Sequence, residues 1–298
     1  MAEERVGILG CGYVGMELAR QLRNDYEVFG VRRSPAGLEA VAETGAEPIR
    51  ADLTDPDDVA SLPDADVLVF TASSRGNTGP GAIYNTALES VLEDFGSRGT
   101  PPDRLIYTGS TGVYGDFGGD WVDETTPIEP ETDRQEILLE AERLALEVAP
   151  TFDIDGTVVR FGGLYGPDRY RMDRYLEGPV TAGYLNLVHR DDAAGVLAFL
   201  IEGDRLRNET LLAVDDEPLE KWQFADWLAD AVGVAQPPKQ TVEDRLDAGT
   251  RSDAQRQRIV ASKRCSNEKL RELGYEFRFP TASDGYEPAI EAEREGAR

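Results

Sequence analysis

Lysine, histidine and cysteine are scarce in this chain of 298 residues, which holds four lysines, one histidine and two cysteines. Two cysteines are too few for a disulfide framework, and one histidine with scattered thiols gives no cluster of metal ligands. Apolar runs of the roughly 20 residues that cross a bilayer are also missing. The first residues carry no apolar stretch behind a basic head, so we expect no secretory signal and a cytoplasmic location.

Basic residues are far outnumbered by acidic ones. The chain has 31 lysines and arginines against 57 aspartates and glutamates, a formal net charge of −26. Phosphate backbones and anionic lipid surfaces repel such a chain, so we expect neither a nucleic-acid nor a membrane partner. The acid-rich, lysine-poor composition resembles that of halophilic proteins, which work in molar salt where the Debye length falls to about 3 Å. An ordinary acidic cytosolic protein is the alternative.

Hydrophobic residues make up 40% of the chain, enough for a sizeable core and unlike a disordered protein. Short apolar runs predict strands at residues 5–10, 26–31, 48–51, 66–70, 104–108, 157–161 and 210–214. Helical spacing of apolar residues predicts helices at residues 13–23, 38–43, 83–95, 134–148, 192–201 and 219–232. This alternation predicts an α/β fold, a doubly wound parallel sheet of Rossmann type, with a small C-terminal substrate lobe.

The two halves of the chain differ in regularity. We expect a first domain, of Rossmann type, over residues 1–160. Residues 161–298 would hold the remaining sheet elements and the C-terminal lobe, interleaved with the first part in one folding unit. Residues 243–257 are polar and a candidate mobile segment, and residues 291–298 lack an apolar anchor and are expected to fray.

The sharpest motif is the glycine pattern GCGYVG at residues 10–15, which follows a predicted strand and opens a predicted helix. Gly10 would allow the tight turn, Gly12 would let the backbone approach a pyrophosphate, and Gly15 would let helix and strand pack closely. The N-terminus of the helix would add N–H groups and positive potential. The pattern predicts a dinucleotide site; a glycine-rich turn without a ligand is the alternative.

The end of the second predicted strand indicates which dinucleotide is bound. A carboxylate about 20 residues after the first glycine would bind the ribose 2′-hydroxyl, whereas arginine accommodates a 2′-phosphate. The strand runs instead into Arg32, Arg33 and Ser34. Because guanidinium groups match the geometry of a phosphate, we expect the cofactor to be NADP, with NAD as the second possibility. The alternative is that the two arginines lie in a solvated loop and bind no cofactor.

Six blocks in order carry a resemblance to a known family. They are the glycine loop, Asp52-Leu53, and residues 71–73, 107–115, 160–167 and 188–193. Over roughly residues 5–290 the chain resembles the extended and atypical short-chain dehydrogenase/reductases, the NAD-dependent epimerase/dehydratase group. By this resemblance Asp52 and Leu53 would lie by the adenine, residues 71–73 would line the cofactor, and Ser110 matches the catalytic serine. The predicted cofactor site therefore comprises Gly10, Gly12, Tyr13, Val14, Gly15, Arg32, Arg33, Asp52, Leu53, Thr71, Ala72 and Ser73.

One departure from the family pattern concerns its acid–base pair. The family carries Tyr-x-x-x-Lys on the helix after the serine block, and the lysine lowers the pKa of the tyrosine. Arg134 and Leu138 stand at these positions here, and the first lysine of the chain is Lys221. This absence resembles the atypical subgroup, which keeps the dinucleotide fold without the standard pair.

Other side chains are weaker candidates for proton chemistry. Ser110 and Thr111 could hydrogen-bond a reacting oxygen, and they are the predicted catalytic residues. We expect His189 to be a structural residue at a helix start, and the carboxylates at residues 116, 120, 123 and 124 to be solvated surface. Residues 167–175, with three arginines and two tyrosines, are either an anion-binding loop or a surface segment held by Arg–Asp pairs.

These observations predict an NAD(P)-dependent oxidoreductase or epimerase/dehydratase-like enzyme that acts on a small, anionic or sugar-like substrate. The alternative, favoured by the missing Tyr/Lys pair, is a catalytically inactive NAD(P)H-binding sensor or assembly protein. No metal is predicted, and the formation of a homodimer stays open.

Overall fold

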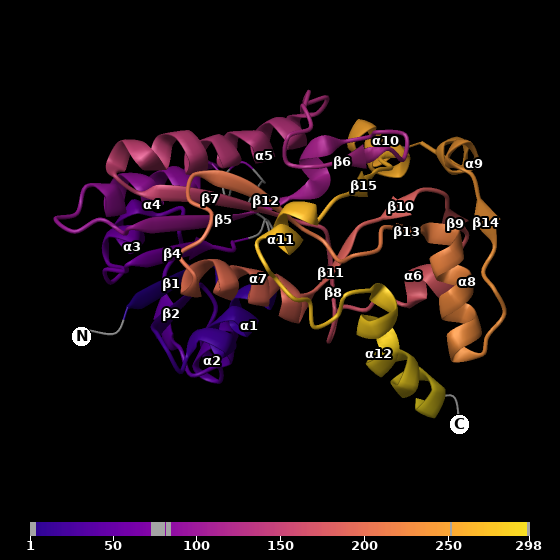
Figure 1. The fold of residues 1–298 in the computed structure, drawn as a ribbon, viewed down its shortest axis with the longest axis horizontal. Helices are drawn as coiled ribbons and strands as arrows, with labels where there is room; N and C mark the ends of the chain where they lie inside the picture. Colours follow the sequence, from indigo (N-terminus) through magenta and orange to yellow (C-terminus); the bar gives the residue numbers. More distant parts are fainter. Residues whose placement is uncertain (1–3, 73–80, 82–84, 251, 297–298) are drawn as a thin grey trace. The chain divides into compact units, whose positions relative to one another are not determined.

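A computed structural model describes residues 4–72, 81, 85–250 and 252–296 (Figure 1). The chain folds into two compact units, each assembled from three segments. Unit 1 comprises Met1–Ser110, Asp133–Arg160 and Ala193–Leu211. Unit 2 comprises Thr111–Thr132, Phe161–Asp192 and Leu212–Arg298. In the described residues no helix combines the length and the apolar character that crossing a bilayer requires.

A seven-stranded sheet organises unit 1, with the strand order β12-β7-β5-β4-β1-β2-β3. The strands are β1 (Arg5–Leu9), β2 (Glu27–Arg32), β3 (Glu47–Arg50), β4 (Val67–Phe70), β5 (Arg104–Ser110), β7 (Asp155–Phe161) and β12 (Glu209–Ala213). The pairings that join β3, β2, β1, β4 and β5 are all parallel. Strand β4 is buried along its whole length, which fits its continuous apolar sequence and a sheet covered on both faces.

Helices cover both faces of this sheet, with α1 and α2 on one side and α4 and α5 on the other (Figure 1). The elements around the sheet are α1 (Tyr13–Leu22), α2 (Pro35–Ala42), α3 (Pro56–Ala60), α4 (Ala87–Gly96), α5 (Asp133–Arg143), η3 (Leu144–Val148), η4 (Ala149–Phe152) and α7 (Arg190–Glu202). Phe70 of β4 packs with Leu92 and Phe95 of α4 in a fully buried core. The predicted doubly wound α/β sheet of Rossmann type is therefore confirmed.

Unit 2 contains paired short strands. The pairs are β6 (Trp121–Val122) with β15 (Arg264–Cys265), β8 (Gly163–Tyr165) with β11 (Leu187–His189), β9 (Val180–Thr181) with β14 (Lys239–Gln240), and β10 (Tyr184–Leu185) with β13 (Leu219–Glu220). Its helical elements are η2 (Thr111–Tyr114), α6 (Asp173–Leu176), α8 (Lys221–Val232), α9 (Val242–Asp247), α10 (Asp253–Val260), α11 (Glu268–Glu272) and α12 (Ala282–Gly296). Tyr165, Phe224 and Tyr286 form its aromatic core, with ring centroids of Tyr286 4.9 Å from Tyr165 and 5.2 Å from Phe224.

Hydrogen-bonded caps, rather than the spacing of apolar residues, determine where several helices begin. Helix α2 begins at Pro35, three residues before the predicted start, because the Ser34 hydroxyl accepts the Gly37 N–H at 3.2 Å and proline suits a first helical position. The polar segment 243–257 overlaps α9 and α10, and capping boxes at Thr241 and Ser252 start these two helices. Helix α12 continues to Gly296 and so includes most of the segment for which we expect fraying, and residues 291–295 are exposed there.

Candidate functional site

The glycine loop lies at the carboxyl end of β1, where the strand order reverses between β1 and β4. Open α/β sheets bind ligands at such a switch point. Gly10 has a φ of 79°, and a Cβ at this residue would lie 2.4 Å from the Cα of Ala72, just after β4. Only glycine accepts both this backbone conformation and this close approach.

The start of α1 is built for a ligand rather than for a side-chain cap. Gly12 is the N-cap and offers no side-chain acceptor to the N–H groups of the first turn. Thr71 closes the loop, because its hydroxyl donates to the Gly10 carbonyl at 3.0 Å. A Cβ on Gly15 would lie 2.9 Å from Cγ2 of Ile8, so glycine lets α1 pack closely on β1. This cradle fits a pyrophosphate held by the N-terminus of the helix.

Arg32, the last residue of β2, lies beside this cradle. Its Nη1 is 3.1 Å from the place that a Cβ on Gly12 would occupy, and its Nε is 2.7 Å from the corresponding place at Gly37. Since Gly37 belongs to the first turn of α2, the guanidinium lies against the N-terminal turns of two helices. Within the described part of the chain no carboxylate forms an ion pair with Arg32. An anion at this place would meet a guanidinium and two positive helix ends.

Arg33 and Asp52, both predicted to contact the cofactor, contact each other. Nη1 of Arg33 lies 3.1 Å from Oδ2 of Asp52, and both side chains are partly exposed. Thr54 donates to Oδ1 of Asp52 through its hydroxyl at 2.7 Å and its N–H at 3.1 Å. Burial by itself would raise the pKa of Asp52, but the hydrogen bonds from Thr54 and Arg33 hold that pKa below its usual value. The ionised Asp52 therefore orients Arg33, whereas Arg32 is not engaged in this way.

The remaining predicted cofactor residues also belong to unit 1. Tyr13 and Val14 form the first turn of α1, and Ala72 follows β4. Leu53 is buried in the core beneath this edge of the sheet. Ser73 lies outside the described residues.

Ser110 ends β5 at the same carboxyl edge of the sheet as the glycine loop and is partly buried. The β5 strand is held to β4 by parallel pairing and by the Thr108 hydroxyl, which donates to the Phe70 carbonyl at 3.0 Å. Thr111 opens the short helix η2 in unit 2 and is buried. A half-buried hydroxyl at the end of β5 can donate a hydrogen bond to a substrate oxygen.

A buried ion pair supports β5 one residue before Ser110, and the sequence analysis missed it. Arg160 of β7 donates to Glu142 of α5 from Nε at 3.0 Å and from Nη2 at 2.7 Å, and the side chains are 8% and 5% exposed. A Cβ on Gly109 would lie 3.0 Å from Oε1 of Glu142, so the carboxylate rests against β5. Burial raises the pKa of Glu142, and Arg160 opposes this shift. The sequence carries one signal for this pair, namely a charged residue in each of the two elements at a position that faces the protein interior.

The two residues that the resemblance aligns with the family's Tyr/Lys pair differ in their surroundings. Arg134 lies exposed in the first turn of α5, and Leu138 is buried one turn later. Neither a guanidinium nor a leucine side chain supplies the phenol that the family's pair uses to exchange a proton.

His189 makes the contacts of a structural residue in unit 2. Its ring is 2% exposed and packs against Phe279, with ring centroids 4.0 Å apart. Its Nδ1 accepts the Asp191 N–H at 3.2 Å. Burial lowers the pKa of His189 to about 4, against an opposing effect of the Asp191 charge, so the imidazole is neutral at pH 7.

The carboxylates of the acidic loop after η2 differ in exposure. Asp116 and Asp120 are exposed, as expected for solvated surface, whereas Asp123 and Glu124 are partly buried and accept hydrogen bonds. Oδ1 of Asp116 accepts the N–H groups of Gly118 at 3.1 Å and Ser262 at 2.9 Å. Glu124 accepts the Leu212 N–H at 2.7 Å. Backbone N–H groups in loops need acceptors, and these carboxylates supply them.

The arginine-rich segment 167–175 divides its residues between core and surface. Tyr170 packs on Tyr286, and Tyr175 packs on Phe224, with ring centroids 5.4 Å and 4.9 Å apart. Arg171 and Arg174 are exposed, and no ion pair engages either of them among the residues that the structure describes. The predicted alternative of Arg–Asp pairs therefore fails for these two arginines.

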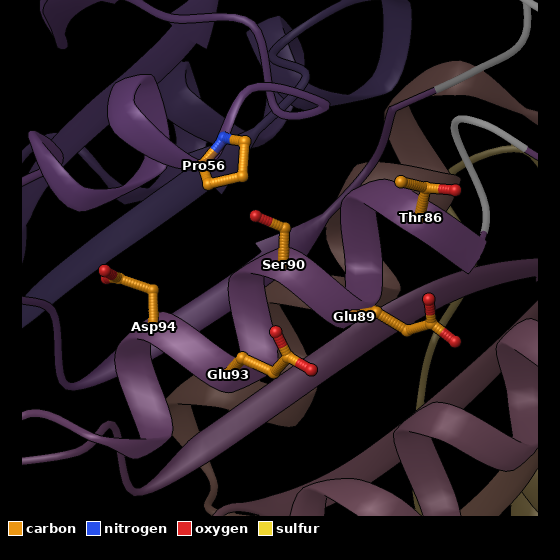
Figure 2. A pocket seen from close by; sticks show the side chains of 6 residues that line it. All are labelled: Pro56, Thr86, Glu89, Ser90, Glu93 and Asp94. Carbon is orange, nitrogen blue, oxygen red and sulfur yellow. The ribbon is translucent and has the colours of Figure 1, made fainter.

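A hollow of about 420 Å³ in unit 1 lies on α4, and no residue of the glycine loop lines it (Figure 2). Figure 2 shows three carboxylates around it, and the lining residues are Pro56, Thr86, Glu89, Ser90, Glu93 and Asp94. Such a lining repels phosphate groups, so the hollow is not a dinucleotide site. Across the described ranges no group of three or more His, Cys, Asp or Glu side chains could hold a metal ion.

Comparisons with known proteins agree with this geometry. The profile of the NAD dependent epimerase/dehydratase family matches residues 6–216. Protein YeeZ of Escherichia coli K12 is 31% identical over 287 residues, which cover 93% of this chain and 97% of YeeZ. A Methylobacillus flagellatus structure described as an NAD-dependent epimerase/dehydratase is 30% identical, with a TM-score of 0.76 over 98% of this chain and 100% of that one. A human epimerase family protein solved with NADPH shares the fold, with 19% identity and a TM-score of 0.73 over 98% and 99% of the two chains. This chain belongs to the NAD dependent epimerase/dehydratase family.

Proposed function

We propose that the protein is an NADP(H)-dependent oxidoreductase or epimerase/dehydratase-like enzyme that acts on a small anionic substrate. Family membership and the cradle formed by Gly10, Gly12 and Gly15 support a nicotinamide dinucleotide. The observation that carries the choice of NADP is Arg32, whose guanidinium lies at the N-terminal turns of α1 and α2 without a carboxylate partner in the described chain. That surrounding suits the dianionic 2′-phosphate, whereas it offers a ribose 2′-hydroxyl no carboxylate acceptor.

Each part of the site would contribute a separate step of binding. The first turn of α1 would hold the pyrophosphate, Arg32 the 2′-phosphate, and Asp52 would keep Arg33 at the rim of the adenine site. The bound nicotinamide supplies hydride transfer. The hydroxyl of Ser110, with Thr111 as a second donor, would hydrogen-bond the reacting oxygen of the substrate and fix its orientation.

The second candidate is a cofactor-bound sensor or assembly protein without turnover. It is favoured by α5, where the exposed Arg134 and the buried Leu138 occupy the positions of the family's proton-transfer pair. A tyrosine without a neighbouring lysine keeps a pKa of about 10, so it is a poor general acid or base at neutral pH. The enzyme is therefore expected to be slow on ordinary alcohols and sugars, since general acid–base catalysis is typically worth ~10²–10⁴-fold.

Calorimetry with NADPH and NADH at one fixed salt concentration tests the proposal. NADPH should bind more tightly, and Arg32→Asp should reverse the preference, because charge-assisted hydrogen bonds to the 2′-phosphate contribute about 1.5–3 kcal/mol, or tenfold and more in affinity. The matched control is Arg5→Asp, which makes the same charge change at the opposite end of β1. Equal affinities of the unmodified protein for the two dinucleotides would refute the NADP assignment.

A further inference from the structure

Trp121, the first residue of β6 in unit 2, is exposed although tryptophan is the largest apolar side chain. It is 54% exposed, and in the described chain Val234 is the other large hydrophobic residue that is exposed. The two other tryptophans are engaged, since Trp222 donates its indole N–H to the Val180 carbonyl at 2.8 Å and Trp227 stacks on a neighbouring ring. The indole N–H of Trp121 makes no hydrogen bond within the described residues. Single exposed apolar residues are common, so the surroundings of Trp121 decide whether it has a role.

The exposed ring is held in one orientation by a stack of side chains. The guanidinium of Arg264 in β15 lies over the Trp121 ring, 5.1 Å from its centroid, and over the Tyr184 ring at 5.2 Å. Nε of Arg264 donates to the Gly119 carbonyl at 2.7 Å, which fixes the guanidinium. The pairing of β6 with β15 places Trp121 opposite Arg264, and Val122, the next residue, is buried. Much of the side-chain entropy that a contact would cost is therefore already lost.

Basic residues gather near this ring, against the trend of the chain. Residues 252–264 hold four basic residues and one acidic residue, whereas the whole chain holds 31 and 57. Arg256 and Arg258 of α10 are exposed, and no ion pair engages either of them among the residues that the structure describes. Helix α10 lies against the segment that follows β6, because Gln257 donates to the Glu131 carbonyl at 3.2 Å (Figure 1).

Carboxylates lie on the same surface. The Arg264 N–H donates to the Asp120 carbonyl at 2.9 Å, and Glu129 comes two residues before the Glu131 carbonyl that binds α10. Asp120 and Glu129 are exposed, and in the described ranges neither forms an ion pair. The surface thus carries both signs of charge around one exposed ring. We call it the mixed-charge surface, and its residues are Asp120, Trp121, Glu129, Arg256 and Arg258.

The mixture of charges selects the partner. The two carboxylates of the surface repel a uniformly acidic partner, and the two arginines repel a uniformly basic one. A second copy of this chain, related by a two-fold rotation, can place its arginines against the carboxylates of the first copy and receive the reverse contact. Tryptophan and arginine are also the residues that contribute most at the centre of protein interfaces.

We propose that the mixed-charge surface of unit 2 is the contact of an isologous homodimer. Trp121 of each copy would be buried against the other copy, and its indole N–H would gain a carboxylate as acceptor. Salt favours this contact, because screening weakens the repulsion between two copies that each carry a charge of −26. The inference goes beyond the proposed function, since no residue of the cofactor site takes part in it.

Sedimentation equilibrium over a dilution series at about 1 M KCl, where the Debye length is about 3 Å, tests the contact. The unmodified protein should sediment as a dimer. Trp121→Ala should raise the dissociation constant about a hundredfold or more, because both copies lose a central tryptophan. Val234→Ala removes the other exposed large hydrophobic side chain and is the matched control, which should leave the dissociation constant within about twofold.

Two charge-reversed variants test the two-fold pairing, and both should fold because only exposed side chains change. Arg256→Glu with Arg258→Glu makes the surface acidic, and Asp120→Arg with Glu129→Arg makes it basic. Each variant alone should be a monomer at the lowest salt concentration in which it stays folded. A mixture of the two should form a heterodimer, because every contact between the copies then joins opposite charges.

Arg171→Glu with Arg174→Glu is the control for charge, since it reverses two exposed arginines elsewhere in unit 2 and should keep the dimer. The proposal is overturned if the unmodified protein is a monomer at every concentration, or if folded Trp121→Ala keeps the original dissociation constant. A mixture of the charge-reversed variants that stays monomeric also overturns it. An assembly that grows without limit indicates a head-to-tail contact and refutes the two-fold pairing.

Discussion

Breaking the Glu142–Arg160 pair should be among the most damaging single changes in unit 1. Glu142→Met leaves a guanidinium that is 8% exposed without its carboxylate, although that carboxylate accepts hydrogen bonds at 2.7 Å and 3.0 Å in the intact protein. Removing one partner of a buried pair costs about 3–5 kcal/mol. For a unit of this size that loss corresponds to a fall in melting temperature of roughly 6–20 °C.

A double-mutant cycle separates the pair from its surroundings. Glu142→Met and Arg160→Met should each be strongly destabilised, whereas the double variant should recover most of the loss, because an apolar pair carries no desolvation penalty. Glu140→Met is the control on the same helix, since the Glu140–Arg143 pair is 38% and 44% exposed and should contribute less than about 1 kcal/mol. Thermal unfolding by circular dichroism at fixed salt measures all five proteins. A double variant whose loss equals the sum of the two single losses would refute the reasoning.

Three further outcomes are expected. The melting temperature should rise markedly between about 0.1 M and 1 M salt as the Debye length shrinks from roughly 10 to 3 Å, because screening relieves the repulsion of a chain at −26; a flat profile contradicts the halophilic interpretation. Ser110→Ala should abolish turnover while NADPH affinity stays within a few-fold, and retained turnover in a steady-state assay rules out its catalytic role. Asp215 is 2% exposed, and burial raises its pKa well above the ordinary value. The folded state thus keeps a proton on Asp215 that the unfolded state releases above pH ~4, so the free energy of unfolding falls as pH rises above that value. Asp215→Asn should make the free energy of unfolding, measured by denaturant titration, depend less on pH.

Features that depend on neighbours in the sequence could be predicted from it. The apolar runs that became β1, β2 and β4 are continuous, and the GCGYVG loop fixes a turn, a helix start and a close contact within six residues. Caps were the exception among local features. Ser34 starts α2 through its hydroxyl and Thr241 starts α9 through a capping box with Asp244, and apolar periodicity detects neither.

Features that depend on distant residues could not be predicted. Glu142 and Arg160 lie 18 residues apart in the chain, and an isolated helix and strand say nothing about which charges will face each other. Lys221 and Ser262 lie about 40 residues apart in the chain, and only the folded chain shows that the ammonium group of one and the hydroxyl of the other both lie near Gly183. The engagement of Arg33 by Asp52, which singles out Arg32, likewise became visible only when β2 and the segment after β3 were placed.

The threading of the chain through its two units has a consequence for how the protein can be divided or recombined. Asp133–Arg160 and Ala193–Leu211 both return to unit 1, so no single cut separates the units. A fragment that stops at residue 160 would lose β12 and leave β7 as an uncovered edge strand, which invites aggregation. Exchanging unit 2 between two relatives would require three separate segments to be transferred together. Recombination in this architecture therefore proceeds by substitutions within a unit rather than by the replacement of a module.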